Sequence, residues 1–137
     1  MRCTCTRRFA LAGLASAFAA RVAQASDDHR PFIDAAFRMR DDAVRAGDQA
    51  YGAVVVKDGR IVGFGPSRVI QNKDQTAHAE REAIRDAQVK VGRDLSGCLL
   101  YSSSRPCSAC EAAAAEANIA RMIHGRNATD AGVPRKS

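Results

Sequence analysis

The chain has 137 residues, of which 46% are hydrophobic and 26% charged, as expected for one globular domain with a single core. No stretch approaches the roughly 18 apolar residues that a membrane-spanning helix needs, so composition excludes an integral membrane protein. The formal charge of +6 does not indicate a nucleic-acid-binding surface, because four basic and no acidic residues lie in residues 1–25 and the remainder is nearly neutral.

Residues 1–25 resemble a cleavable export signal. A basic head precedes an apolar run from Phe9 to Ala20, and Ala23-Gln24-Ala25 offers the small residues of a cleavage site. Arg7-Arg8 further resembles the twin-arginine type of signal. We therefore predict a mature domain over residues 26–137 and a periplasmic or exported location. A cytoplasmic protein with an unstructured start is the alternative.

The mature part opens with a predicted helix and a predicted hairpin. From Pro31 onward apolar residues recur at helical spacing, and Gly47 is placed to end the helix. The apolar run from Tyr51 to Val56 is rich in β-branched residues. The turn Lys57-Asp58-Gly59-Arg60 and a second apolar run from Ile61 to Phe64 follow it, a pattern typical of a hairpin.

The second half predicts helices and strands in alternation. In chain order we expect a loop, a helix, a strand, a helix and a strand over residues 65–75, 76–90, 98–102, 107–118 and 119–123. Asp74 or Thr76 is expected to cap the first of these helices, and Gly92 to stop it. The polar tail beyond Gly125 is expected to carry no regular structure. The alternation predicts an α/β fold, in which helices cover a sheet.

Two short motifs carry candidate chemistry. His78 and Glu80 stand two residues apart, a pair that occurs often by chance. Cys107 and Cys110 stand three apart at a predicted helix start, where they face the same way and the helix dipole favours thiolates. That cysteine pair suits either metal binding or disulfide exchange.

Together with His78, the two cysteines supply one imidazole and two thiolates. Such a ligand set suits zinc and leaves the fourth tetrahedral position free for water. Glu80 is then placed to accept a proton from that water. The other cysteines do not indicate a disulfide framework, because Cys3 and Cys5 lie in the predicted signal and an odd number remains.

These motifs resemble the H-x-E and P-C-x-x-C signature of the zinc-dependent cytidine and deoxycytidylate deaminase superfamily. The resemblance runs from about residue 50 to residue 125, and the block Thr76-Ala77-His78-Ala79-Glu80 is most similar to the branch of guanine, cytosine and tRNA adenosine deaminases. It implies a three-layer α/β/α sandwich with a mixed sheet of about five strands.

The resemblance also implies roles for individual residues. His78, Cys107 and Cys110 would bind Zn²⁺, and Glu80 would be the catalytic proton carrier. The backbone at Ala79 would lie beside the substrate. The implied reaction is hydrolytic deamination of an amino-bearing nucleobase or nucleoside, with release of ammonia. A homodimer or larger assembly is also implied, and the small side chains of Ala112 to Ala115 would permit close helix packing.

Two departures from that branch concern the substrate. Ser67 stands where relatives commonly have an Asn that helps to hold the base or sugar, and a hydroxyl cannot supply the paired donor and acceptor of an amide. Arg105 stands where relatives commonly have Glu, which replaces a carboxylate near the mouth of the site by a cation. Acidic or phosphorylated substrates then become conceivable. A solvated loop residue is the alternative reading of Arg105.

Two other functions remain open at this point. Cys107 and Cys110 could serve as a thiol-disulfide pair in an oxidising compartment. A catalytically silent domain of the same fold could keep zinc and bind a ligand or partner. A nucleic-acid substrate fits poorly, because the mature chain is nearly neutral and an exported enzyme would not meet tRNA.

Overall fold

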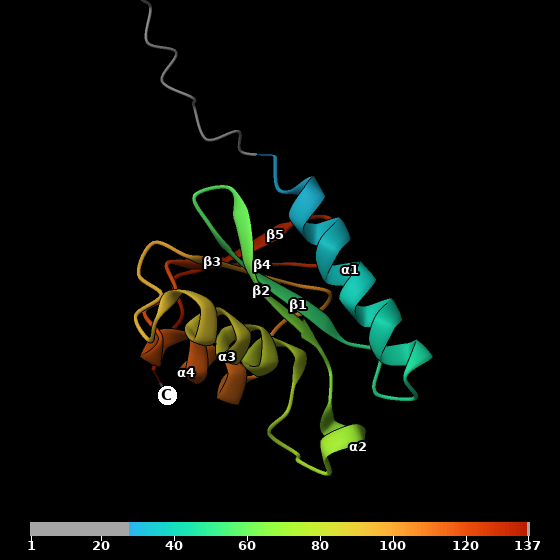
Figure 1. The fold of residues 1–137 in the computed structure, drawn as a ribbon. Coiled ribbons are helices and arrows are strands. Elements are labelled where there is room, and N and C mark those ends of the chain that lie inside the picture. Colours follow the sequence, from blue (N-terminus) through green and yellow to red (C-terminus); the bar gives the residue numbers. More distant parts are fainter. Residues whose placement is uncertain (1–27, 137) are drawn as a thin grey trace, which may run out of the picture.

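The computed structural model describes residues 28–136, and the predicted export signal lies outside them. Four helices and five strands follow one another in this range (Figure 1): α1 (Arg30–Arg45), β1 (Gly52–Lys57), β2 (Arg60–Pro66), α2 (Val69–Asn72), α3 (Ala79–Val91), β3 (Leu99–Ser102), α4 (Ser108–Glu116), β4 (Arg121–His124) and β5 (Thr129–Gly132). None of these helices combines the length and the apolar character that crossing a membrane requires.

The five strands form one mixed sheet in the order β2-β1-β3-β4-β5. Strands β3 and β4 are parallel and are joined through α4, whereas the other neighbouring pairs are antiparallel. Ala53 at the start of β1 pairs with Ser102 at the end of β3, and Gly52 pairs with Pro66 at the end of β2. The loops that lead to α2 and α4 therefore leave the sheet at the same end.

Helix α1 covers one face of the sheet, and α3 and α4 cover the other (Figure 1). Strand β1 serves both layers, because successive side chains of a strand point to opposite faces. Val54 and Val56 pack in the core beneath α1, and Ala53 and Val55 pack in the core beneath α3 and α4. The predicted three-layer α/β/α sandwich with a five-stranded mixed sheet is confirmed.

The predicted hairpin is also confirmed. Asp58 and Gly59 both have positive φ angles, 49° and 75°, which the two central residues of a type I′ turn require. The expected α1 and the strands at 98–102 and 119–123 are present with ends shifted by one or two residues, a shift typical of element boundaries.

Three expectations from the sequence are wrong. The loop over residues 65–75 contains the single-turn helix α2. The tail contains β5, which pairs with β4 in antiparallel orientation and forms the edge of the sheet. Neither Asp74 nor Thr76 caps α3, because His78 occupies the N-cap position with an extended ψ of 151° and no side-chain capping bond. Asp74 instead accepts hydrogen bonds from the backbone N–H and hydroxyl of Thr76.

Helix α3 lies directly on β2 because glycines face it. A Cβ atom at Gly65 would overlap the carbonyl oxygen of Ala79 and lie 2.5 Å from the backbone nitrogen of Ala83. A Cβ atom at Gly63 would overlap the carbonyl oxygen of the same Ala83. Since these are backbone atoms of a helix, any larger side chain must push the start of α3 away from the sheet.

We expect Gly65→Ala to lower the free energy of unfolding by about 3 kcal/mol, at the upper end of the cost of overpacking a core. Gly97→Ala is the matched control, since its Cβ would meet no atom within 4 Å and only its φ of +79° is unfavourable. That control should lose about 1 kcal/mol. Urea unfolding measures both variants, and an equal loss in the two would contradict direct packing of α3 on β2.

Candidate metal centre and cleft

Two helix N-termini meet at the end of the sheet where β1 begins and β3 ends. His78 immediately precedes α3, and Cys107 immediately precedes α4, each in extended conformation at the N-cap position. Their carbonyl oxygens accept the first helical hydrogen bonds, from the backbone N–H groups of Glu82 and Glu111, both at 2.9 Å. Cys110 lies in the first turn of α4 and is fully buried.

The structure thus brings together three side chains that could hold a metal ion. The Nδ1 atom of His78 lies 3.4 Å from the Sγ atom of Cys110 and 3.6 Å from that of Cys107. All three ligand atoms lie within 4.8 Å of one another. Tetrahedral zinc with bonds of about 2.0–2.3 Å places such ligands roughly 3.5 Å apart, so the donor set fits this ion.

Among residues 28–136, this candidate metal site has three ligands, and no fourth histidine, cysteine or carboxylate lies close enough to join them. Three protein ligands with an open position are typical of catalytic zinc, whereas structural zinc usually has four. Burial raises the pKa of Cys110, and the neighbouring Glu80 carboxylate raises it further. A thiol in this position gives up its proton readily only to a bound cation.

Glu80 lies in the first turn of α3, and its side chain is buried with 5% of the residue exposed. Burial raises the pKa of Glu80, and this outweighs the lowering effect of its own backbone N–H, of Cys110 and of His78. A carboxyl group with a raised pKa returns an accepted proton less readily to water than an ordinary one, so it can carry the proton to a second group. Glu80 therefore has the properties of a general acid and base beside the metal ligands.

Two of the metal ligands, His78 and Cys107, open into a cleft of about 790 Å³, a size typical of small-molecule sites. It is lined by Gln49, Ala50, Tyr51, His78, Glu80, Ser104, Arg105 and Cys107. The first three belong to the segment before β1, and Ser104 and Arg105 to the loop between β3 and α4. Tyr51 is 47% exposed and offers an aromatic face on which a planar ring can stack.

The predicted substrate-contact residues take different places. Arg105 lies on the wall of the cleft, and its contact with a substrate stays a prediction. Ser67 is 1% exposed and is not among the lining residues, because its hydroxyl donates a hydrogen bond of 3.1 Å to the carboxylate of Asp48. Ala79 is fully buried, with its carbonyl oxygen facing Gly65. The expected contact from the Ser67 side chain is thus corrected to a supporting bond.

Asp48 is a supporting residue that sequence reasoning missed. Besides Ser67, its carboxylate accepts hydrogen bonds from the backbone N–H groups of Gln49, Ile70 and Gln71, at 2.8, 3.1 and 2.9 Å. Burial alone would raise the pKa of Asp48, but these hydrogen bonds lower it overall. The carboxylate ties the first turn of α2 to the segment before β1, which lines the cleft.

We expect Asp48→Asn to lower the free energy of unfolding at pH 7 by about 1–3 kcal/mol, because an amide cannot accept all four bonds. Since the pKa of Asp48 is lowered in the folded protein, its contribution is complete above the ordinary aspartate pKa of about 3.9 and is lost as the pH falls below it. Urea unfolding at pH 7 and pH 3 should show the variant and the wild type converging at the lower pH. A constant difference would contradict the assignment.

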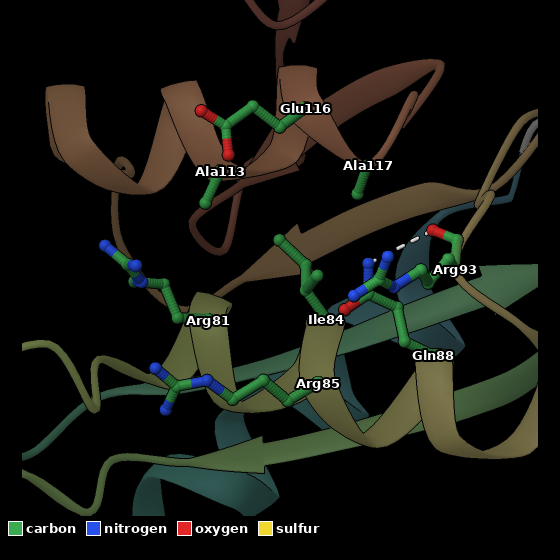
Figure 2. Close-up of a pocket in the computed structure, with 8 residues that line it drawn as sticks. All are labelled: Arg81, Ile84, Arg85, Gln88, Arg93, Ala113, Glu116 and Ala117. Atoms are coloured by element: carbon green, nitrogen blue, oxygen red, sulfur yellow. Dashed lines mark hydrogen bonds between the residues drawn. The ribbon is translucent and has the colours of Figure 1, made fainter.

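A second cavity, of about 440 Å³, lies between α3 and α4. Figure 2 shows its three arginine side chains, from Arg81, Arg85 and Arg93, and Glu116 on the α4 side. The floor is formed by Ile84, Ala113 and Ala117, and Gln88 completes the lining. This cavity shares no lining residue with the cleft and holds no histidine or cysteine.

The chain is similar to known deaminases. Residues 26–126 match the cytidine and deoxycytidylate deaminase zinc-binding region. The guanine deaminase of Bacillus subtilis is 38% identical over 106 residues, which cover 76% of this chain and 68% of that protein. The tRNA-specific adenosine deaminase of Aquifex aeolicus is 36% identical over 93 residues, covering 67% of this chain and 62% of that protein.

The solved structure of the Bacillus subtilis guanine deaminase shares the fold, with a TM-score of 0.69 and 37% identity over 72% of this chain. The matched region is 64% of that structure. The chain therefore spans less than two thirds of the solved guanine deaminase and of the Aquifex aeolicus protein.

Proposed function

This chain belongs to the cytidine and deoxycytidylate deaminase family, and we propose that it is a zinc-dependent hydrolase that removes an amino group from a nucleobase or nucleoside and releases ammonia. One observation carries the proposal. The ligand atoms of His78, Cys107 and Cys110 lie within 4.8 Å of one another, and the buried carboxyl group of Glu80 lines the same cleft.

In the proposed mechanism His78, Cys107 and Cys110 hold the metal ion. Zinc, when bound, supplies Lewis-acid activation of the attacking water. Glu80 accepts a proton from that water and delivers it to the ring nitrogen next to the amino-bearing carbon. The water oxygen forms a bond to the amino-bearing carbon as the ring nitrogen is protonated. Glu80 then moves the second proton of the water to the amino group, the C–N bond breaks, and ammonia leaves. Tyr51 provides a face for the ring during these steps.

The proposal is tested by ammonia release from zinc-replete protein. Cytosine, guanine, adenine, their nucleosides and their nucleotides form the panel, because the similar proteins are named for guanine and for adenosine in tRNA. We expect one group of compounds to be deaminated. Zinc-bound protein that releases no ammonia across the panel would favour a catalytically silent domain instead.

The thiol-disulfide alternative makes a different prediction about metal content. In the structure Cys107 and Cys110 are free thiols, as is Cys98. We expect purified protein to contain about one zinc per chain and to keep both thiols reduced. Protein that lacks zinc and carries a Cys107–Cys110 disulfide would defeat the deaminase proposal.

The proposal includes assembly into a homodimer or larger oligomer. Ala112 and Ala115 leave partly exposed small side chains on α4, which would permit close packing of a second copy. Light scattering of wild type and Ala112→Arg measures the assembly. We expect the variant to dissociate, and a monomeric wild type would contradict this part of the proposal.

Export is also part of the proposal. It is supported by the sequence of residues 1–25 alone and places the enzyme in the periplasm or outside the cell. N-terminal sequencing of protein from the native host should find a start near Ser26. A soluble protein that begins at Met1 or Arg2 would contradict export.

A further inference from the structure

We propose that Arg105 binds an oxyanion of the substrate, a phosphate or a carboxylate, at the mouth of the cleft. The inference rests on the proposed deamination and names the class of compound on which the site would act. It makes Arg105 a specificity-determining residue: the amino-bearing ring would lie toward Glu80 and the metal ligands, and the anionic group toward Arg105.

The loop that carries Arg105 is fixed, while the guanidinium group is free. The backbone N–H of Ser103 donates to the carbonyl oxygen of Gly52 at 2.9 Å, and the Ser103 hydroxyl accepts from the Gly52 N–H at 3.1 Å. On the other side of Arg105, Pro106 is buried and Cys107 is the N-cap of α4. Arg105 itself is exposed and lines the cleft beside Ser104.

No protein carboxylate in the described part of the chain forms an ion pair with Arg105. The nearby Glu111 instead accepts hydrogen bonds from the backbone N–H and the Nε atom of Arg135, at 3.1 and 3.3 Å. The carboxylate of Glu111 is therefore already engaged, and the guanidinium of Arg105 is available to a ligand.

The other groups that line the cleft leave its mouth electropositive. Arg105 carries the one fixed positive charge among the lining residues, and Glu80, the one carboxyl group among them, is buried. The N-termini of α3 and α4 meet at this cleft and add to the positive potential. Such a mouth attracts anions, and a guanidinium binds phosphate or carboxylate through two parallel hydrogen bonds.

A neutral base offers no anionic group for Arg105 to bind. Gln49, Tyr51 and Ser104 already supply neutral hydrogen-bonding groups around the ring site. The volume of about 790 Å³ lies in the upper half of the range for small-molecule sites and leaves room for a substituent beyond the ring. The geometry therefore favours a substrate with a charged group that can reach Arg105.

The test compares neutral and anionic members of matched pairs. Cytidine with cytidine monophosphate, and guanosine with guanosine monophosphate, form the phosphate arm; cytosine with carboxycytosine forms the carboxylate arm. We expect kcat/KM to be at least about 10-fold higher for the anionic member in one arm, which identifies the source of the oxyanion. Calorimetric Kd values on the zinc-loaded Glu80→Gln protein give a readout that does not need turnover.

Arg105→Gln should lose about 10- to 100-fold in kcat/KM and in affinity for the anionic member, and less than about 3-fold for its neutral partner. Arg105→Lys should lose less. Arg38→Gln, an exposed arginine of α1 on the opposite face, is the control and should change neither.

The inference would be overturned if neutral and anionic compounds had equal kcat/KM and equal Kd values and if Arg105→Gln changed neither. The proposed deamination would still stand in that case. Failure of the proposed deamination would give a different result. Arg105-dependent binding of the anionic compound, with no ammonia from any compound of the panel, would overturn the proposed deamination and leave the anion site.

Discussion

Glu80→Gln is expected to lower kcat by about 10²- to 10⁴-fold, the usual contribution of a general acid and base, while the zinc content stays unchanged. Glutamine has nearly the same shape as glutamate but cannot accept a proton from water and pass it on. The buried position of Glu80 strengthens the expectation, because bulk water cannot easily replace it as the proton carrier. The group lies beside the metal ligands without belonging to them.

The measurement pairs ammonia release with metal analysis on the same protein samples. Glu116→Gln is the matched control, since Glu116 is an exposed carboxylate of α4 outside the cleft and should leave kcat unchanged. Equal turnover in Glu80→Gln and wild type would rule out Glu80 as the proton carrier. Loss of zinc in Glu80→Gln would instead make it a part of the metal site.

Cys110→Ser is expected to weaken zinc binding by more than about 100-fold, because even the loss of an outer-shell partner costs 10- to 100-fold. A serine hydroxyl stays protonated near neutral pH and is a poor zinc ligand, whereas a thiolate is a good one. Zinc should therefore raise the unfolding midpoint of the wild type in urea and leave that of the variant almost unchanged.

Cys98→Ser provides the control for this substitution. Cys98 is also a free, fully buried cysteine, but it lies outside the metal group, immediately before β3. It should lose stability without losing zinc. Competition with a chelator measures the affinities, and equal zinc affinity in Cys110→Ser and the wild type would contradict the assigned ligand set.

Much of the fold could be predicted from local patterns in the sequence. The Asp58-Gly59 turn between two β-branched runs predicts the hairpin, because few residues tolerate the positive φ angles that it needs. His78 and Cys107 are 29 residues apart in the chain but both immediately precede a helix that leaves the same end of the sheet. The alternating α/β order of the sequence therefore predicts that His78 and Cys107 lie close together.

The missed features depend on contacts that no local pattern reveals. Strand β5 is exposed at three of its four residues, and it pairs with β4, with an ion pair between Arg121 and Asp130 across the two strands. Helix α2 has one turn, whose first N–H groups are held by Asp48 from about 20 residues earlier in the sequence. Ser67 was predicted to contact the substrate because relatives commonly have an Asn at its position. Its hydrogen bond to Asp48 is a tertiary contact that the sequence does not reveal.

The central claim is that the His78, Cys107, Cys110 and Glu80 site uses water to replace an amino group. It is tested most directly by running the zinc-replete protein in heavy-oxygen water and analysing the product by mass spectrometry, with Glu80→Gln alongside. We predict one solvent oxygen in each product molecule, one ammonia per product, and loss of both in the variant. Ammonia without solvent oxygen in the product, or undiminished incorporation in Glu80→Gln, would contradict the account.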